Sequence, residues 1–227
     1  MKSWSNEAKA PSLAAMAKTS EPDLDAAYAL ETPDDNRALY RSWAETYDTE
    51  FVDASGFRLP GLVAQAYVAK GGGWPVLDVG CGTGAVAKAL PAGAEVDGLD
   101  LSPDMLSVAR RTGLYRSLTE ANLLEPLPLA TASYAGILSS GTFTHGHVGA
   151  EALDELTRVL APGGWAAVSI RDTIFETMGF AETFAQLTKA GTITPPEHRP
   201  VRIYDTPEGL APGHSEDIAF ITTFRRL

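Results

Sequence analysis

The sequence contains a single cysteine, Cys81. One thiol cannot form an intramolecular disulfide, and unpaired cysteines are typical of proteins in a reducing compartment such as the cytoplasm. A zinc site built from cysteines is excluded for the same reason, and we expect no metal ligands elsewhere. Acidic residues near Cys81 disfavour a reactive thiolate, so we interpret it as a small loop residue.

Basic residues are also scarce. There are 18 Lys and Arg against 29 Asp and Glu, which gives a formal net charge of −11. Nucleic acids and anionic membranes both select a basic surface, so neither is an expected partner. No apolar run has the length of a membrane span, and residues 10–17 are too short and too weakly apolar for a signal peptide. We therefore expect a cytoplasmic protein, a monomer or homodimer, that acts on a small molecule.

From about residue 74 onward, short apolar segments alternate with helical patterns. The expected strands are residues 74–79, 95–99, 114–121, 134–139 and 165–170. This alternation predicts an α/β fold with a doubly wound, mostly parallel seven-stranded sheet. The last two expected strands, residues 201–204 and 218–224, have no helix between them and predict an antiparallel edge.

The pattern divides the chain into three parts. Residues 1–33 have no clear period and predict a flexible or marginally helical arm. Residues 34–55 contain a helix that would bury its aromatic face by folding over a ligand as a lid, with Tyr47 as the expected contact. Residues 56–227 form the α/β domain.

The stretch VLDVGCGTG, residues 76–84, follows the first expected strand. Doubly wound sheets bind ligands at the carboxyl ends of their strands, so this is an expected binding loop. Gly80 and Gly82 let the backbone turn and approach a ligand closely. No Gly-Lys-Ser/Thr follows, which excludes a P-loop. The loop does fit the dinucleotide pattern G-x-G-x-x-G/A, which leaves an NAD(P)-dependent oxidoreductase as an alternative.

Two carboxylates favour a ligand other than a dinucleotide. Asp78 lies two residues before Gly80, where its charge would repel a pyrophosphate and attract an ammonium group. Asp100 follows the second expected strand, where a carboxylate can accept both ribose hydroxyls. A ribose and an amino acid group without phosphate describe S-adenosylmethionine.

Four motifs in order, VLDVGCGTG, VDGLDLSPDMLSVAR, ANLLEPLPL and LTRVLAPGGW, resemble the signature of the class I S-adenosylmethionine-dependent methyltransferases. LYRSWAETYDTEF resembles the lid helix of the small-molecule branch, and GLYRSLTEANLLEPLPL is similar to methyltransferase-like proteins of the Williams–Beuren type. The resemblance implies methyl transfer to an O, N or C atom of an unidentified small molecule, with S-adenosylhomocysteine as product. A non-catalytic, degenerate S-adenosylmethionine-binding protein is the alternative.

The resemblance also implies roles for single residues. Gly80 and Gly82 would contact the methionine moiety beside Asp78, and Asp100 would bind the ribose. The rest of the expected cofactor site consists of Leu101 and Met105 as adenine walls, Asn122 at the adenine amino group, Leu123 at the ring edge, Ser139 and Tyr47. Asp is commoner in the family at the position of Asn122, although an amide oxygen also accepts a hydrogen bond.

His145 and His147 follow the fourth expected strand, where the acceptor would approach the methyl group. An imidazole there could take a proton from the acceptor, so both are candidate bases. The alternative for either histidine is a solvated glycine-rich loop. Arg171 ends the fifth expected strand, and we interpret it as part of a surface salt bridge rather than a substrate contact.

Overall fold

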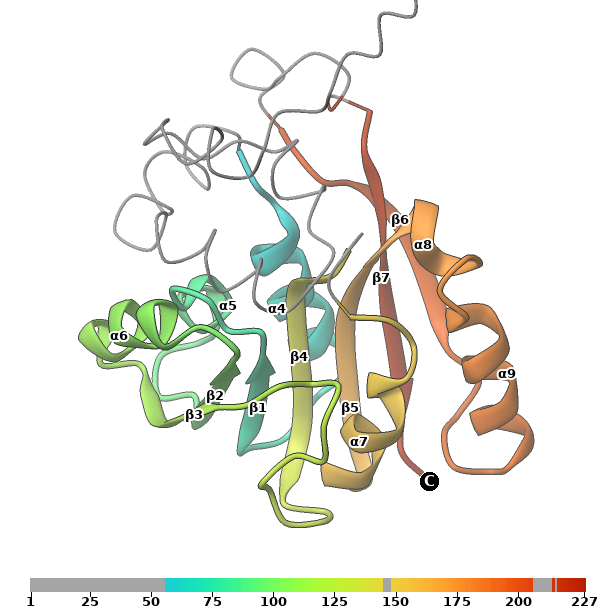
Figure 1. Cartoon of the computed structure of the whole chain (residues 1–227), viewed down its shortest axis with the longest axis horizontal. Helices are drawn as coiled ribbons and strands as arrows, with labels where there is room; N and C mark the ends of the chain where they lie inside the picture. The colour runs from blue at the N-terminus through green and yellow to red at the C-terminus, as the bar shows by residue number, and fades with distance from the viewer. Residues whose placement is uncertain (1–55, 145–147, 206–213, 215) are drawn as a thin grey trace, which may run out of the picture.

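The computed structural model describes residues 56–144, 148–205, 214 and 216–227 (Figure 1). The expected arm and lid, with Tyr47, lie outside the described residues, as do His145 and His147. The helices are α4 (Leu59–Ala69), α5 (Ala85–Ala89), α6 (Pro103–Thr112), α7 (Ala152–Val159), α8 (Asp172–Phe175) and α9 (Phe180–Lys189). The strands are β1 (Val76–Val79), β2 (Val96–Asp100), β3 (Tyr115–Glu120), β4 (Tyr134–Phe143), β5 (Leu160–Arg171), β6 (Glu197–Arg202) and β7 (Ile218–Arg225).

The strands form one seven-stranded sheet in the order β3-β2-β1-β4-β5-β7-β6. Strands β1 to β5 pair in parallel, whereas β7 runs antiparallel to both β5 and β6. The order reverses between β1 and β4, and ligands of doubly wound sheets bind at such a switch point. The predicted fold class and the predicted antiparallel edge are therefore confirmed.

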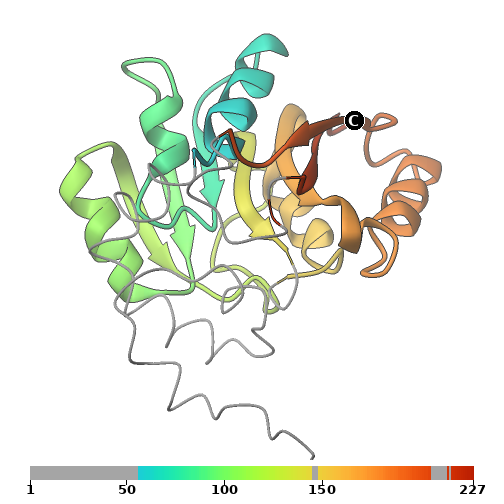
Figure 2. The same ribbon diagram turned by 90° about the horizontal axis from the view of Figure 1, so that it is seen from above.

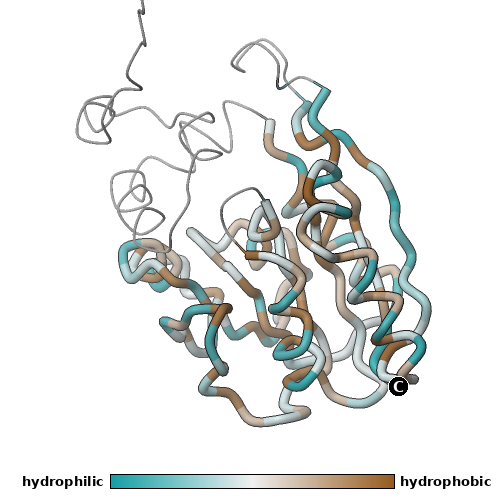
Figure 3. The backbone as a smooth tube through the Cα atoms, turned by 45° about the vertical axis from the view of Figure 1, so that its right-hand side comes forward, coloured by the Kyte–Doolittle hydropathy of each residue, from teal (hydrophilic) through white to brown (hydrophobic). Residues whose placement is uncertain are grey.

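Helices cover both faces of the sheet (Figure 2). One buried cluster joins the sheet to α7, α8 and α9, and includes Leu153, Leu156 and Phe180. The other joins the opposite face to α4 and α5 through residues such as Val63 and Val86. Hydrophobic positions recur along the strands, as expected for a sheet that is buried on both sides (Figure 3). Within the described residues, no helix has the length and apolar character needed to cross a membrane.

Local sequence signals explain where α6 begins and ends. The Ser102 hydroxyl accepts a hydrogen bond from the Met105 N–H at 3.3 Å, and Pro103 occupies the first turn. Gly113, with φ of 68°, ends the helix in the left-handed conformation that glycine adopts readily. Residues at both ends of the helix thus account for its bounds.

Two strands are longer than the apolar pattern predicts. Strand β4 continues past Ser139 to Phe143, because Phe143 still pairs with Ile170 of β5 and Gly141 N–H donates to the Ser169 hydroxyl at 3.0 Å. Strand β5 begins at Leu160, directly after α7, because Leu160 pairs with Tyr134. The extension of β4 carries its polar residues to the carboxyl edge of the sheet.

Tyr67 fixes α4 to the sheet. Its side chain is fully buried, and its hydroxyl donates to the carbonyl oxygen of Gly73. The ring lies directly against Gly72 and Gly136, so that a Cβ at either glycine would overlap it. Glycine at these two positions is therefore a packing requirement.

We predict opposite effects of alanine at two glycines. Gly136→Ala overlaps the Tyr67 ring and is expected to lower the unfolding free energy by about 1–3 kcal/mol, the usual cost of overpacking a core. Gly61→Ala lies in α4 with no described atom within 4 Å of the new Cβ, and is expected to raise it by up to about 1 kcal/mol. Urea denaturation of both variants measures these changes, and equal stability of the two would contradict the packing argument.

Candidate functional site

The loop between β1 and α5 contains two glycines with different surroundings. Gly80 has φ of 65°, and a Cβ there would overlap the Thr142 hydroxyl. Gly82 has φ of 52°, but no atom of the described residues lies within 4 Å of where its Cβ would be. Gly80 is thus required by packing inside the protein, whereas Gly82 leaves open space next to the loop.

Hydrogen bonds from β4 hold the end of β1. The carbonyl oxygen of Val79 accepts from the Ser139 hydroxyl at 2.8 Å and from the Thr142 hydroxyl at 3.1 Å. Ser139 is fully buried, so its hydroxyl supports the loop from beneath. Sequence reasoning did not identify Thr142, although it lies in the polar segment that follows the expected fourth strand.

Asp100 ties the loop to α6. One carboxylate oxygen accepts from Gly82 N–H and the other from Ser102 N–H, both at 2.8 Å. Burial raises the pKa of Asp100, and these backbone N–H groups lower it. Asp100 therefore lies against the glycine loop.

Asp78 is a fully buried carboxylate at the centre of the site. Its Oδ2 accepts a hydrogen bond from the Tyr115 hydroxyl at 2.7 Å, while Oδ1 has no partner among the described residues. Burial raises the pKa of Asp78 to about 7, with the Tyr115 hydrogen bond lowering it and the nearby Asp100 charge raising it further. An unpartnered buried carboxylate oxygen is costly, which suggests that a ligand supplies the missing donor.

Cys81 is buried, with 4% of its surface exposed, and burial raises the pKa of its thiol. A neutral buried thiol is a poor nucleophile. The structure thus agrees with its interpretation as a small loop residue.

The remaining expected cofactor residues follow β2 and β3 at the same edge. Leu101 is partly exposed at the end of β2, and Met105 is 2% exposed in the first turns of α6. Asn122 is partly exposed, and its Oδ1 accepts from Leu124 N–H at 3.0 Å, while Leu123 is buried. The amide oxygen of Asn122 has a second lone pair for another donor.

A second polar cluster lies at the carboxyl end of β5. Arg171 Nη2 lies 2.9 Å from Asp217 Oδ1, and His214 Nδ1 lies 2.9 Å from Asp217 Oδ2. The three side chains are only 10–13% exposed, so the expectation of a surface salt bridge at Arg171 is corrected to a largely buried ion pair. Sequence reasoning missed His214 and Asp217, for which the H-x-x-D spacing was the available signal.

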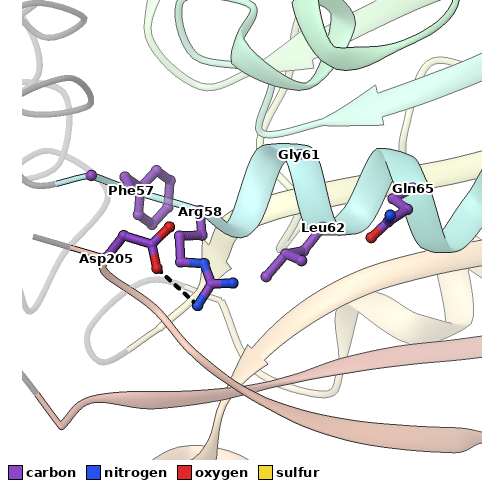
Figure 4. Close-up of a pocket in the computed structure, with 7 residues that line it drawn as sticks. Phe57, Arg58, Gly61, Leu62, Gln65 and Asp205 are labelled. Atoms are coloured by element: carbon purple, nitrogen blue, oxygen red, sulfur yellow. Dashed lines mark ion pairs between the residues drawn. The ribbon is translucent and has the colours of Figure 1, made fainter.

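A pocket of about 570 Å³ lies beside the start of α4 (Figure 4). Its lining includes Phe57, Leu62 and Gln65, together with the ion pair between Arg58 Nη1 and Asp205 Oδ1 at 3.0 Å. None of the residues that the sequence predicts to bind the cofactor lines this pocket. We therefore treat it as separate from the glycine-loop site.

The fold and the glycine-loop site define a class of protein. A family model of a methyltransferase domain matches residues 77–168, which include most of β1 together with Asp78 and Asp100. Residues 77–168 therefore match a methyltransferase domain, and the comparisons support the class I S-adenosylmethionine-dependent methyltransferase family. The cofactor of this family is S-adenosylmethionine, which becomes S-adenosylhomocysteine on transfer.

Individual proteins support this assignment. Methyltransferase-like protein 27 of Homo sapiens is 36% identical over 140 residues, which are 59% of this chain and 56% of that protein. An O-methyltransferase of Pyrenophora dematioidea is 34% identical over 113 residues, 46% of this chain and 41% of that protein. The chain thus matches about half the length of these curated relatives. The solved structure of an S-adenosylmethionine-dependent methyltransferase from Thermotoga maritima has a TM-score of 0.58 at 18% identity, covers 84% of this chain and 99% of its own, and shows the shared fold.

The residues present fit this cofactor. Gly82 opens onto free space, and the Asp78 oxygen without a partner among the described residues suits an ammonium group. Asp100 accepts backbone N–H groups from Gly82, Ser102 and Leu101, and its carboxylate still has acceptor capacity for a ribose hydroxyl.

We predict that Asp78 makes stability fall as the pH rises. Between the usual aspartate pKa and about 7, the folded protein binds a proton that the unfolded chain has released. Stability from this group is therefore present at low pH and lost as the pH rises through 7. The unfolding free energy of Asp78→Asn, measured relative to wild type, is expected to increase by about 2–3 kcal/mol from pH 5 to pH 8.

Asp97→Asn is the control for this measurement. Although burial raises the pKa of Asp97, hydrogen bonds from Arg116 bring it below its usual value, so Asp97 does not titrate between pH 5 and pH 8. Its effect on stability is expected to be the same at both pH values. Urea denaturation at pH 5 and pH 8 measures both variants, and a constant effect of Asp78→Asn would contradict the burial argument.

Proposed function

We propose that the protein transfers a methyl group from S-adenosylmethionine to an O, N or C atom of a small-molecule acceptor. The observation that carries the proposal is the buried Asp78 oxygen without a partner among the described residues, next to a glycine loop that opens at Gly82. A cationic amino acid group satisfies such an oxygen, and a phosphate does not. The name of the Pyrenophora relative favours an oxygen atom as acceptor.

In this proposal, one half of the carboxyl edge of the sheet binds the cofactor and the other half binds the acceptor. The cofactor lies over β1, β2 and β3, where Asp78 binds the ammonium group and Gly80 and Gly82 the methionine moiety. Asp100 binds the ribose, and the adenine is enclosed by Leu101, Met105, Asn122 and Leu123. Ser139 acts through Val79, whose carbonyl oxygen it holds. Tyr47 remains a sequence prediction as a contact from the lid.

The acceptor then lies over β4, β5 and β7. When bound, S-adenosylmethionine would supply a methyl carbon on a sulfonium that a nucleophile of the acceptor can attack, with S-adenosylhomocysteine as the leaving group. The contribution of the protein is to hold the acceptor in line with that methyl carbon, and proximity and orientation account for most of the rate. His145 and His147 stay predictions as bases. Among described residues at this edge, His214 is a further candidate, because Asp217 orients its ring.

Two alternatives to this function remain to be tested. An NAD(P)-dependent oxidoreductase would place a pyrophosphate beside the buried Asp78 carboxylate, and like charges disfavour this. A non-catalytic cofactor-binding protein keeps the same site without an acceptor. The cytoplasmic location, the absence of nucleic-acid partners and the monomer or homodimer state also stay predictions from the sequence.

Calorimetric titration with S-adenosylmethionine, S-adenosylhomocysteine and NAD tests the proposal. We expect both sulfur nucleosides to bind and NAD to give no heat of binding. Binding of NAD alone would overturn the proposal. Transfer of a labelled methyl group to a panel of phenols, carboxylic acids and amines, with release of S-adenosylhomocysteine, then separates an enzyme from a binding protein.

The two loop glycines are expected to respond differently to alanine. Gly82→Ala meets no described atom, so it is expected to cost only the left-handed strain of about 1–2 kcal/mol in stability but to obstruct the cofactor. Gly80→Ala adds an overlap with Thr142 to the same strain and is expected to be the less stable variant. Thermal denaturation and titration with S-adenosylhomocysteine measure both, and wild-type affinity of Gly82→Ala would show that the cofactor does not approach there.

A further inference from the structure

The contact between Tyr115 and Asp78 spans three strands of the sheet. Tyr115 is the first residue of β3, Asp78 lies in β1, and β2 runs between them. Neighbouring strands are about 4.8 Å apart, so the two backbones are separated by on the order of 10 Å. The tyrosine side chain must pass over β2 for its hydroxyl to reach the carboxylate at 2.7 Å.

A glycine in β2 makes room for this crossing. A Cβ at Gly98 would lie 2.9 Å from Tyr115 Cε1 and 2.6 Å from Leu118 Cδ2, closer than packed atoms approach. On its other edge, the ring lies against Gly84, where a Cβ would be 3.2 Å from Tyr115 Cε2. Two positions without side chains thus determine where the ring can lie.

Among the described residues, the other groups near Asp78 do not compensate its negative charge. The Asp100 carboxylate on β2 raises the pKa of Asp78, and the Cys81 thiol in the loop is held neutral by burial. The β4 hydroxyls of Ser139 and Thr142 donate to Val79 instead. Within the described residues, Asp78 depends on Tyr115 for its hydrogen bond.

We propose that Tyr115 is a positioning residue for the cofactor: its hydroxyl fixes one oxygen of Asp78 and leaves the other for the ammonium group of the ligand. This inference rests on the proposed function. Without the hydroxyl, the carboxylate can rotate about its terminal torsion, and its charged form loses a hydrogen bond. Both changes weaken the contact with an ammonium group and leave contacts with the nucleoside unaffected.

The test compares two ligands on Tyr115→Phe. S-adenosylhomocysteine carries the amino acid group, whereas 5′-methylthioadenosine has the same adenine, ribose and sulfur without it. At pH 8, Tyr115→Phe is expected to weaken S-adenosylhomocysteine binding about tenfold, the worth of one charge-assisted hydrogen bond. The affinity for 5′-methylthioadenosine is expected to change less than about twofold, because its binding does not involve Asp78.

The pH profile is a second readout. A neutral Asp78 does not attract an ammonium group, so wild-type affinity for S-adenosylhomocysteine is expected to fall as the pH drops below about 7. Removal of the Tyr115 hydrogen bond raises the pKa of Asp78 further. In Tyr115→Phe, the fall is therefore expected to begin about one pH unit higher. A merely structural role of Tyr115 would not move this midpoint.

Tyr134→Phe is the matched control. Tyr134 is a buried tyrosine of the same sheet, and its hydroxyl is hydrogen-bonded to Asp97, which is not among the expected cofactor residues. Tyr134→Phe is expected to be less stable than the wild-type protein. Its affinities for S-adenosylhomocysteine and 5′-methylthioadenosine are expected to show no difference in their response.

The outcomes of the test are distinct. Equal weakening of both ligands by Tyr115→Phe, or unchanged binding of both, would overturn the role of Tyr115 while the proposed function stands. Failure of the wild-type protein to bind S-adenosylhomocysteine would overturn the proposed function and the role of Tyr115 with it.

Discussion

The site is organised around one energetically unfavourable feature, which is the burial of an ionisable carboxylate near the end of a central strand. Asp78 has no exposed surface, and a second carboxylate, Asp100, lies close enough to raise its pKa. Among the described residues, only Tyr115 reduces this cost, by a hydrogen bond to one of the two carboxylate oxygens. Gly98 leaves space that the tyrosine ring occupies, and the ring also packs closely against Gly84. The glycines of this region therefore serve the carboxylate as well as the ligand.

The loop beside Asp78 is held before any ligand arrives. The carbonyl oxygen of Val79 accepts hydrogen bonds from two hydroxyls of β4, and the N–H of Gly82 donates a hydrogen bond to Asp100 of β2. These contacts come from the two strands that flank β1, so the order of the sheet itself determines the loop geometry. A loop fixed in this way loses little conformational freedom on binding, which favours affinity. Asp100 thus has two tasks, since it holds the loop and has lone pairs left for a ribose.

The sequence predicts the fold well because alternating strands and helices leave few topologies for a parallel sheet. The places of Asp78, Gly82 and Asp100 at strand ends and in the loop between them also follow from the expected strand boundaries, while their roles in binding stay predictions. Tyr115 is not predictable in this way, because its contact depends on a gap at Gly98 in a different strand. The end of β4 was missed because polar residues there pair with β5 through backbone and hydroxyl groups rather than apolar packing. The buried character of Arg171 likewise depends on Asp217, 46 positions further along the chain.

The electrostatics of the site select among ligands that the same fold can bind. Sheets of this kind accept dinucleotides and sulfur nucleosides at the same switch point, and glycines alone do not separate them. A pyrophosphate would add negative charge next to two carboxylates, whereas an ammonium group neutralises one of them. In a buried site both effects are larger than they would be in water. Because Asp78 is buried with one oxygen unpartnered among the described residues, we expect the site to favour a cationic ligand group over an anionic one.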